Sequence, residues 1–156
     1  MKLDIGCGNR KKEGYIGIDK VKFDCVDIVK DIQKGLPFLD NVIDEIYCSH
    51  CLEHIEDLIF VMNEFYRVLK KEGVLIIEVP VVYWVEGKNT IINSGDFSVE
   101  SFYYWTKDYM NRADYGIYGY FAIMDRTVMK EEREGYYNVS YNMEIIMKPV
   151  KSRNIP

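Results

Sequence analysis

KLDIGCGNRKKEGYIGID, residues 2–19, begins as a short apolar strand, continues through a loop with Gly6 and Gly8, and closes with a second strand ending at Asp19. Glycines at the exit of a buried parallel strand let the backbone approach a ligand closely and expose its N–H groups. A carboxylate at the tip of the next strand is well placed to accept hydrogen bonds from a ribose diol. The stretch therefore predicts a site for a nucleotide-type cofactor.

The composition limits the class of protein. A chain of 156 residues with 48% hydrophobic residues is expected to form a single domain with a sizeable core. The formal net charge of −5 argues against broad binding to nucleic acid or to an anionic membrane. No apolar run approaches the roughly 20 residues of a membrane span, and the N-terminus has no signal-peptide pattern. We expect a cytoplasmic protein, also because Cys7, Cys25, Cys48 and Cys51 do not suggest a disulfide framework.

The clearest helix is expected over residues 57–71, where apolar side chains recur on one face at helical spacing. Lys70 and Lys71 suit the negative end of its dipole, and Gly73 can end it. Residues 74–80 follow as a nearly all-apolar strand, predicted to be buried on both faces of a parallel sheet. Shorter strands are expected at residues 25–29 and 44–49. The apolar helix face consists of Leu58, Val61, Met62, Phe65, Val68 and Leu69.

The C-terminal half has a different pattern. Ser98 can cap a helix that runs to about residue 112, with Phe102, Trp105, Tyr109 and Met110 facing inward. Two strands are expected at residues 117–124 and 138–147, joined by a charged insert over residues 126–135. Alternating apolar and polar residues in the second strand indicate an antiparallel edge pair.

Together these elements predict one α/β domain over residues 1–156, with a mostly parallel sheet that ends in a C-terminal antiparallel strand pair. Residues 1–80 would form the cofactor-binding half. Residues 81–156 would form the substrate-binding, C-terminal half.

Several motifs follow one another in a characteristic order: Leu3-Asp4-Ile5-Gly6-Cys7-Gly8, then Asp19, Asp31-Ile32, Leu36-Pro37-Phe38, residues 44–55 and Arg67-Val68-Leu69-Lys70. Over residues 2–80 the chain resembles class I S-adenosylmethionine-dependent methyltransferases. Within that class it is most similar to small methyltransferases with a Leu-Glu-His signature, here Leu52-Glu53-His54. The resemblance implies a Rossmann-like methyltransferase fold with S-adenosyl-L-methionine as cofactor.

The resemblance also implies roles for single residues. Asp4 and the backbone of Gly6, Cys7 and Gly8 would hold the amino-acid end of the cofactor. Asp19 would accept both ribose hydroxyls, Asp31 would meet the adenine amine, and Ile32 would pack near the ring. Ser49 and His50 would border the methyl group and the substrate. All of these positions follow predicted strand ends, where open parallel sheets bind ligands. Capping of a helix or turn is the alternative role for Asp19 and Asp31.

The chain departs from the family pattern at its first crossover. Arg10 stands where a third glycine is common, and residues 9–14 are too few for the usual helix, since a parallel crossover takes roughly 10–12 residues or more. We therefore expect a bare loop and a thinly covered sheet face. The chain also begins at the first strand and so is truncated relative to relatives whose N-terminal helices cover the cofactor.

The sequence is less compatible with two other kinds of site. A nicotinamide dinucleotide site needs Gly-x-Gly-x-x-Gly opening a helix, whereas Lys11 stands at the third glycine position. A zinc site could use Cys48, His50, Cys51 and His54, yet no second ligand pair occurs elsewhere in the chain. We therefore predict no metal, and interpret the cysteines as small buried residues.

The expected function is methyl transfer to a small-molecule acceptor. A hydroxyl or ammonium acceptor must lose a proton, and His50 or His54 could take it. His54 and Glu53 have an alternative structural role in holding the loop before the helix at Asp57. The alternative function is a non-catalytic methyltransferase-like binding or structural module. The thin cover and many C-terminal aromatic residues make a homodimer a reasonable hypothesis.

Overall fold

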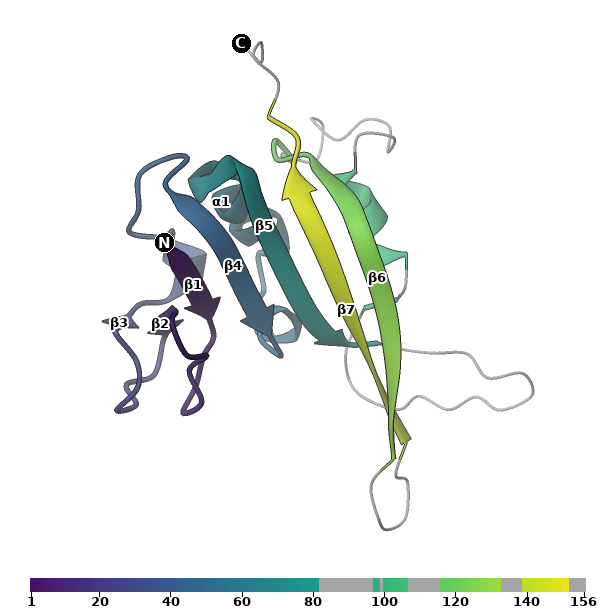
Figure 1. The fold of residues 1–156 in the computed structure, drawn as a ribbon, viewed down its shortest axis with the longest axis horizontal. Helices are drawn as coiled ribbons and strands as arrows, with labels where there is room; N and C mark the ends of the chain where they lie inside the picture. Colours follow the sequence, from purple (N-terminus) through teal and green to yellow (C-terminus); the bar gives the residue numbers. More distant parts are fainter. Residues whose placement is uncertain (82–96, 99, 107–115, 133–138, 152–156) are drawn as a thin grey trace, which may run out of the picture.

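The computed structural model describes residues 1–81, 97–98, 100–106, 116–132 and 139–151. Its strands form one seven-stranded sheet in the order β3-β2-β1-β4-β5-β7-β6 (Figure 1). The five strands from β3 to β5 pair in parallel, and β7 and β6 are antiparallel additions at one edge. The strands are β1 Lys2–Ile5, β2 Ile16–Asp19, β3 Ile28–Val29, β4 Ile43–Ser49, β5 Leu69–Pro80, β6 Phe121–Glu132 and β7 Val139–Pro149. This architecture confirms the predicted fold class.

One α-helix, α1 Leu58–Val68, packs behind the sheet in the view of Figure 1. Asp57 caps it, since its Oδ1 accepts a hydrogen bond of 2.9 Å from the Phe60 N–H. The predicted apolar face is confirmed, because Val61, Met62, Phe65 and Val68 are fully buried. Three short 3₁₀ helices complete the described elements: η1 Ile32–Lys34, η2 Leu52–His54 and η3 Ser101–Trp105.

The predicted end of this helix is wrong. The chain leaves α1 after Val68, and Leu69 already pairs with Ile43 of β4. The register then shifts, so that Glu45 faces Val74, and the segment with Lys70, Lys71 and Gly73 belongs to a bulged strand. The helical spacing of apolar residues extends to Leu69 and so predicted a longer helix. In the structure Leu69 pairs with β4 instead, because tertiary pairing overrides a local helical pattern.

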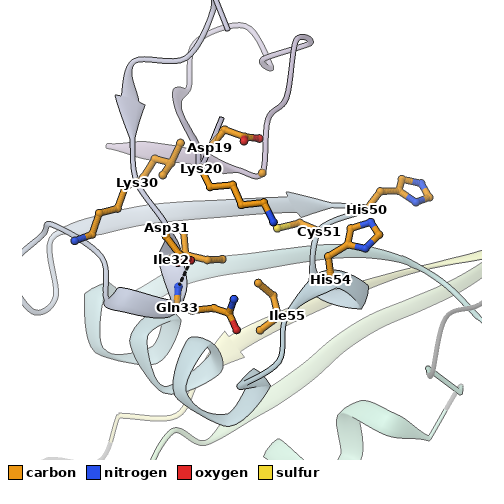
Figure 2. A pocket seen from close by; sticks show the side chains of 12 residues that line it. Asp19, Lys20, Lys30, Asp31, Ile32, Gln33, His50, Cys51, His54 and Ile55 are labelled. Carbon is orange, nitrogen blue, oxygen red and sulfur yellow. Dashed lines mark hydrogen bonds between the residues drawn. The ribbon is translucent and has the colours of Figure 1, made fainter. Parts of the chain in front are cut away.

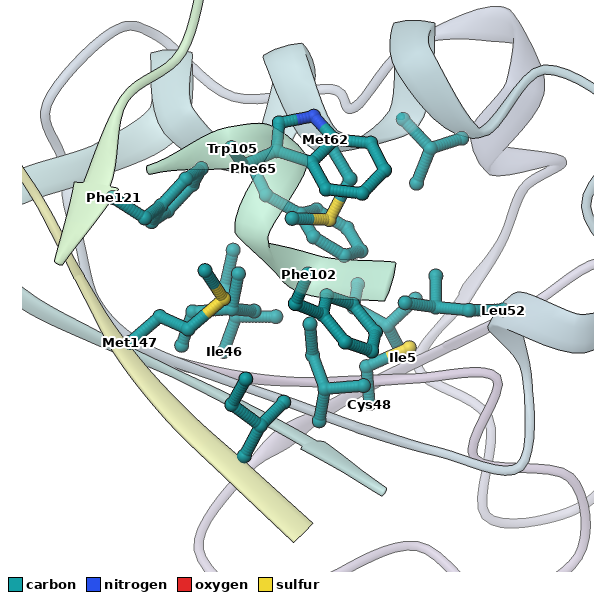
Figure 3. Packing of buried hydrophobic residues seen from close by; sticks show 14 of the residues in the cluster. Ile5, Ile46, Cys48, Leu52, Met62, Phe65, Phe102, Trp105, Phe121 and Met147 are labelled. Carbon is teal, nitrogen blue, oxygen red and sulfur yellow. The ribbon is translucent and has the colours of Figure 1, made fainter. Parts of the chain in front are cut away.

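The core lies on the face of the sheet that α1 covers. Cross-strand registers place Leu3 beside Ile46 and Ile46 beside Leu75, which in turn lies beside Met147. All four side chains are fully buried. Figure 3 shows Met62 and Phe65 of α1 and Phe102 and Trp105 of η3 packed over the buried strand residues.

The opposite face carries no helix among the described residues. Tyr47 and Ser49 of β4 and Val74, Ile76 and Glu78 of β5 are only half-buried there. The prediction of a bare loop between β1 and β2 is therefore confirmed, with no helix between Ile5 and Ile16. The prediction that residues 74–80 are buried on both faces is wrong in part, because no helix among the described residues covers that side of β5.

The C-terminal half differs from expectation in detail. In place of the predicted helix from Ser98, the structure has the single turn η3, and residues 107–115, with Tyr109 and Met110, lie outside the described residues. Phe102 and Trp105 are buried as expected. The charged segment beginning at Arg126 is largely β6 rather than an insert, because an edge strand can expose charged side chains to water.

The remaining strands agree more closely with the sequence. The alternation predicted for residues 138–147 is confirmed over residues 143–147 of β7, where Met143, Ile145 and Met147 are buried and Glu144 and Ile146 only partly so. It is wrong at Asn142, which was expected on the wet face and is only 6% exposed. The strand expected over residues 25–29 is reduced to Ile28–Val29.

Asp57→Ala should lower the free energy of unfolding by about 1 kcal/mol, because the first turn of α1 loses its side-chain acceptor. Urea denaturation at neutral pH measures the change. Glu56→Ala is the matched control, since the neighbouring Glu56 side chain is exposed. Equal stabilities of the two variants would contradict the capping role.

Candidate functional site

A cleft of about 160 Å³ opens at the carboxyl ends of the parallel strands. It lies where the strand order reverses, since the chain pairs β2 on one side of β1 and β4 on the other. Such switch points are where open α/β sheets bind ligands. The cleft is lined by Gly6, Ile18, Asp19, Lys20, Lys30, Asp31, Ile32, Gln33, His50, Cys51, His54 and Ile55 (Figure 2).

The glycine loop closes one wall of the cleft. Gly6 and Gly8 have φ values of +69° and +52°, in the left-handed region that favours glycine. A Cβ on Gly6 would lie 2.6 Å from Cys51 Sγ, so the loop after β1 and the loop after β4 touch at this point. Gly6 is therefore required both by its backbone conformation and by the close approach of Cys51.

Asp19 is the last residue of β2 and lines the cleft as predicted. Its Oδ2 accepts a 2.9 Å hydrogen bond from the Gly8 N–H, and its Oδ1 accepts one of 2.8 Å from the Val21 N–H. A carboxylate offers about four acceptor positions, so two remain for a ligand. The turn-capping alternative is thus real, but it does not exclude a diol-binding role for the same side chain.

Asp31 also lines the cleft and caps the η1 turn, since its Oδ1 accepts a 3.1 Å hydrogen bond from the Gln33 N–H (Figure 2). Lys34 Nζ lies 3.6 Å from its other oxygen. The neighbouring Ile32 is buried and forms an apolar part of the cleft wall. The capping alternative is again observed, and the adenine contact stays a prediction.

Four residues with predicted cofactor roles lie outside the lining of the cleft: Asp4, Cys7, Gly8 and Ser49. Asp4 is 3% exposed, and its Oδ2 accepts a 2.7 Å hydrogen bond from the Lys12 N–H, so it holds the first loop against β1. Burial raises the pKa of this carboxyl. Ser49 instead donates to Glu78 Oε2 over 2.7 Å on the uncovered face of the sheet.

Two buried thiols near the cleft, Cys7 and Cys48, have raised pKa values. Burial raises the pKa of Cys7 to about 11. A hydrogen bond with Cys51, followed by burial, raises the pKa of Cys48 well above its ordinary value. Since the thiolate is the reactive form, these cysteines serve packing. Among the described residues, no group of three or more His, Cys, Asp or Glu side chains could hold a metal ion.

His50 and His54 both line the cleft, as their predicted catalytic role requires. Figure 2 shows the two imidazoles extending from the loop after β4. The His50 side chain is 53% exposed, and its Nδ1 lies 3.5 Å from Glu53 Oε1. His50 has a φ of +49°, and its N–H donates to the Glu78 carbonyl over 2.9 Å. An imidazole with a neighbouring carboxylate therefore lies at the cleft.

Sequence reasoning missed six lining residues: Ile18, Lys20, Lys30, Gln33, Cys51 and Ile55. Lys20 and Lys30 directly flank the predicted acids Asp19 and Asp31, and this adjacency was the available signal. Gln33 had no such signal, because its role is tertiary. Its Oε1 accepts hydrogen bonds from the N–H groups of Glu56 and Asp57 over 2.9 and 3.2 Å, which ties η1 to the loop before α1.

The glycine loop at the end of β1, the acid at the end of β2 and the second acid after β3 are the features on which the resemblance to class I S-adenosylmethionine-dependent methyltransferases rests. A family model described as "Methyltransferase domain" matches residues 10–77, less than half of the chain, and supports the resemblance to methyltransferases. The similarity to small methyltransferases with a Leu-Glu-His signature stays a prediction. A search of curated proteins finds no match.

Solved structures with the same fold include the MccD protein, with a TM-score of 0.65 and 14% identity, covering 95% of this chain and 89% of that one. A candidate S-adenosylmethionine-dependent methyltransferase from Listeria monocytogenes matches with a TM-score of 0.57 and 16% identity, covering 96% and 91%. The [4+2]-cyclase SpnF matches with a TM-score of 0.60 and 18% identity, covering 96% and 74%. At these identities the structures establish the fold alone.

Gly6→Ala should destabilise the protein more than Gly14→Ala, by about 1–3 kcal/mol, because only the first methyl group would overlap with Cys51. Gly14 is the matched control, since it has a φ of +79° and nothing within 4 Å of its Cβ position. Urea denaturation of both variants measures the difference. Equal losses would show that backbone strain alone explains the requirement at position 6.

Asp4→Asn should leave the free energy of unfolding at pH 7 unchanged or raise it. The raised pKa means that ionised Asp4 costs stability, and this cost grows as pH rises through the folded-state pKa. An asparagine carbonyl can still accept from the Lys12 N–H without that cost. Thermal unfolding of both proteins between pH 5 and pH 8 tests this, and a marked loss of stability at pH 7 would refute it.

Proposed function

We propose that the protein transfers a methyl group from S-adenosyl-L-methionine to a small-molecule acceptor. The observation that carries this proposal is the convergence of Gly6, Asp19, Asp31 and His50 on one cleft from the ends of separate strands. The match to the methyltransferase family model supports methyl transfer as the general activity. The acceptor belongs to the proposal.

The residues of the cleft fit this cofactor. Gly6 lines the cleft, so a ligand can approach its backbone, although its Cβ position itself is occupied by Cys51. The free acceptor positions of Asp19 suit a ribose diol, and the apolar side of Ile32 next to Asp31 suits an adenine ring. Asp4 and the Gly8 N–H would position the loop from behind, since both are engaged within the protein. The bound cofactor would supply an electrophilic methyl group.

The protein's own contribution is to orient both reactants and to move a proton. Methyl transfer is an in-line displacement, so positioning supplies much of its catalysis. His50 is the proposed proton acceptor for a hydroxyl or ammonium substrate, and Glu53 would stabilise its protonated form. His54 lies in the same cleft as a second candidate.

A non-catalytic binding module is the second candidate function. Two observations favour it: the cleft is small compared with ligand pockets of about 300–1,000 Å³, and the first crossover lacks a helix. The similarity to a [4+2]-cyclase also indicates that this fold does not by itself determine methyl transfer.

A cytoplasmic location and a homodimer are further parts of the proposal. None of the helices in the described parts of the chain is long and apolar enough to cross a membrane. A second copy could cover the half-buried side chains on the open face of the sheet.

Calorimetric titration with S-adenosylmethionine and S-adenosylhomocysteine decides between the two candidate functions. We expect both to bind, and Asp19→Ala to weaken binding by about 1–3 kcal/mol, because a charged acceptor is lost. Asp24→Ala is the control, since Asp24 is exposed and does not line the cleft. Absence of binding at millimolar ligand would remove the methyltransferase proposal. Equal affinities of the Asp19 and Asp24 variants would remove the role of Asp19.

A further inference from the structure

A second cavity, of about 280 Å³, adjoins the cofactor cleft. Ile55 lines both the cofactor cleft and this second cavity. The short η2 segment lies between them, since its His54 lines the cofactor cleft and its Glu53 lines the second cavity. The first residue of α1 and the turn η3 form the remaining wall. The lining residues are Leu52, Glu53, Ile55, Leu58, Phe97, Ser101, Tyr104 and Trp105.

Two side chains of this cavity carry polar atoms without partners. Among the described residues, three buried side-chain polar atoms lack a hydrogen bond, and two of them are Glu53 Oε2 and Trp105 Nε1. The Glu53 side chain is only 9% exposed, and Trp105 is 5% exposed. Burying a carboxylate oxygen without a partner is costly, so its retention points to a ligand that completes it.

The charge of the cavity selects the kind of ligand. Among the described residues, Glu53 has one ion-pair partner, His50. The Nδ1 atom of His50 lies 3.5 Å from Glu53 Oε1. The unpartnered Oε2 therefore suits a hydrogen-bond donor, and a cationic donor best, because charge-assisted bonds are stronger. A carboxylate or phosphate would face repulsion from Glu53.

The other walls are apolar and aromatic. Leu52 and Phe97 are buried, and Phe97 stacks on Phe102 with ring centroids 5.4 Å apart. Figure 3 shows Phe102 and Trp105 side by side on η3 above the core, and their ring centroids lie 6.1 Å apart. Tyr104 adds an aromatic side chain to the lining. Such walls bind a flat or aliphatic body and favour a neighbouring ammonium through cation–π attraction.

We propose that this cavity is the acceptor site and that it takes a small amine with an apolar or aromatic body, whose nitrogen donates to Glu53 Oε2. This inference rests on the proposed methyl transfer, because the cavity adjoins the cofactor cleft along Leu52–His54. In its ammonium form this nitrogen has no free electron pair, so one of its N–H bonds must break before it can accept a methyl group. The proton passes to the Glu53 carboxylate as an O–H bond forms, and the electron pair remains on nitrogen. His50, whose Nδ1 lies 3.5 Å from Glu53 Oε1, then takes this proton from Glu53, in keeping with its proposed role as proton acceptor.

The test is calorimetric titration of the full chain with benzylamine, benzyl alcohol and benzoate, which share one shape and differ in charge. Each titration is run with and without S-adenosylhomocysteine. We expect benzylamine to bind at least about tenfold more tightly than benzyl alcohol, because hydrogen bonds to charged groups are stronger, and benzoate not to bind. Equal affinity for all three, or preference for benzoate, would overturn the assignment.

Two variants locate the binding. Glu53→Gln should abolish the preference for benzylamine, whereas Glu56→Gln should keep it, because Glu56 is exposed and lines neither cavity. Leu58→Trp should fill the second cavity and remove benzylamine binding while Glu53 stays intact. If Glu53→Gln fails to fold, this variant still tests whether benzylamine binds in the second cavity. Unchanged benzylamine binding in Leu58→Trp would overturn the proposal.

The same titrations separate this inference from the proposed function. Selective benzylamine binding without S-adenosylhomocysteine binding would refute methyl transfer and keep the amine site. The reverse result would keep the cofactor site and refute the amine site. In Leu58→Trp, S-adenosylhomocysteine affinity should stay unchanged, because Leu58 does not line the cofactor cleft.

Discussion

The parallel pairing of β1 with both β2 and β4 is the constraint on which the rest of the structure depends. It sets Ile5 beside Ile18 and Cys48, so that three strands end at one level. The loops leaving these strands must then share a small space, and Gly6 meets Cys51 there without room for a Cβ. The candidate cofactor cleft is a direct consequence of this convergence.

The two faces of the sheet are covered in different ways. On the covered face, α1 and η3 bury a continuous row of aliphatic residues. On the other face, Lys12 of the bare loop lies 3.8 Å from the centre of the Tyr47 ring, and Tyr47 donates to Glu78 over 2.8 Å. Polar and cation–π contacts thus take the place of a helix, which keeps that side half-open.

Local patterns predicted those parts of the fold that depend on local physics. The sequence predicted the apolar face of α1, the strand β4 and the acids at the strand ends. It could do so because periodicity and the ends of strands depend on residues that are neighbours in the sequence. The end of α1 and the extent of β6 could not, because each is set by pairing with a distant strand. Gln33 and Glu53 acquire their roles only through packing between segments.

The sequence by itself determined the fold class, the order of the cofactor motifs and the absence of room for a helix after Gly8. These follow from residue spacing and from the conformational freedom of glycine. Only the tertiary structure decided that Asp4 turns inward to hold Lys12, and that Glu53 and Trp105 share a second cavity. The physical reason is that burial and hydrogen-bond satisfaction are properties of the packed chain, since they depend on residues far apart in the sequence.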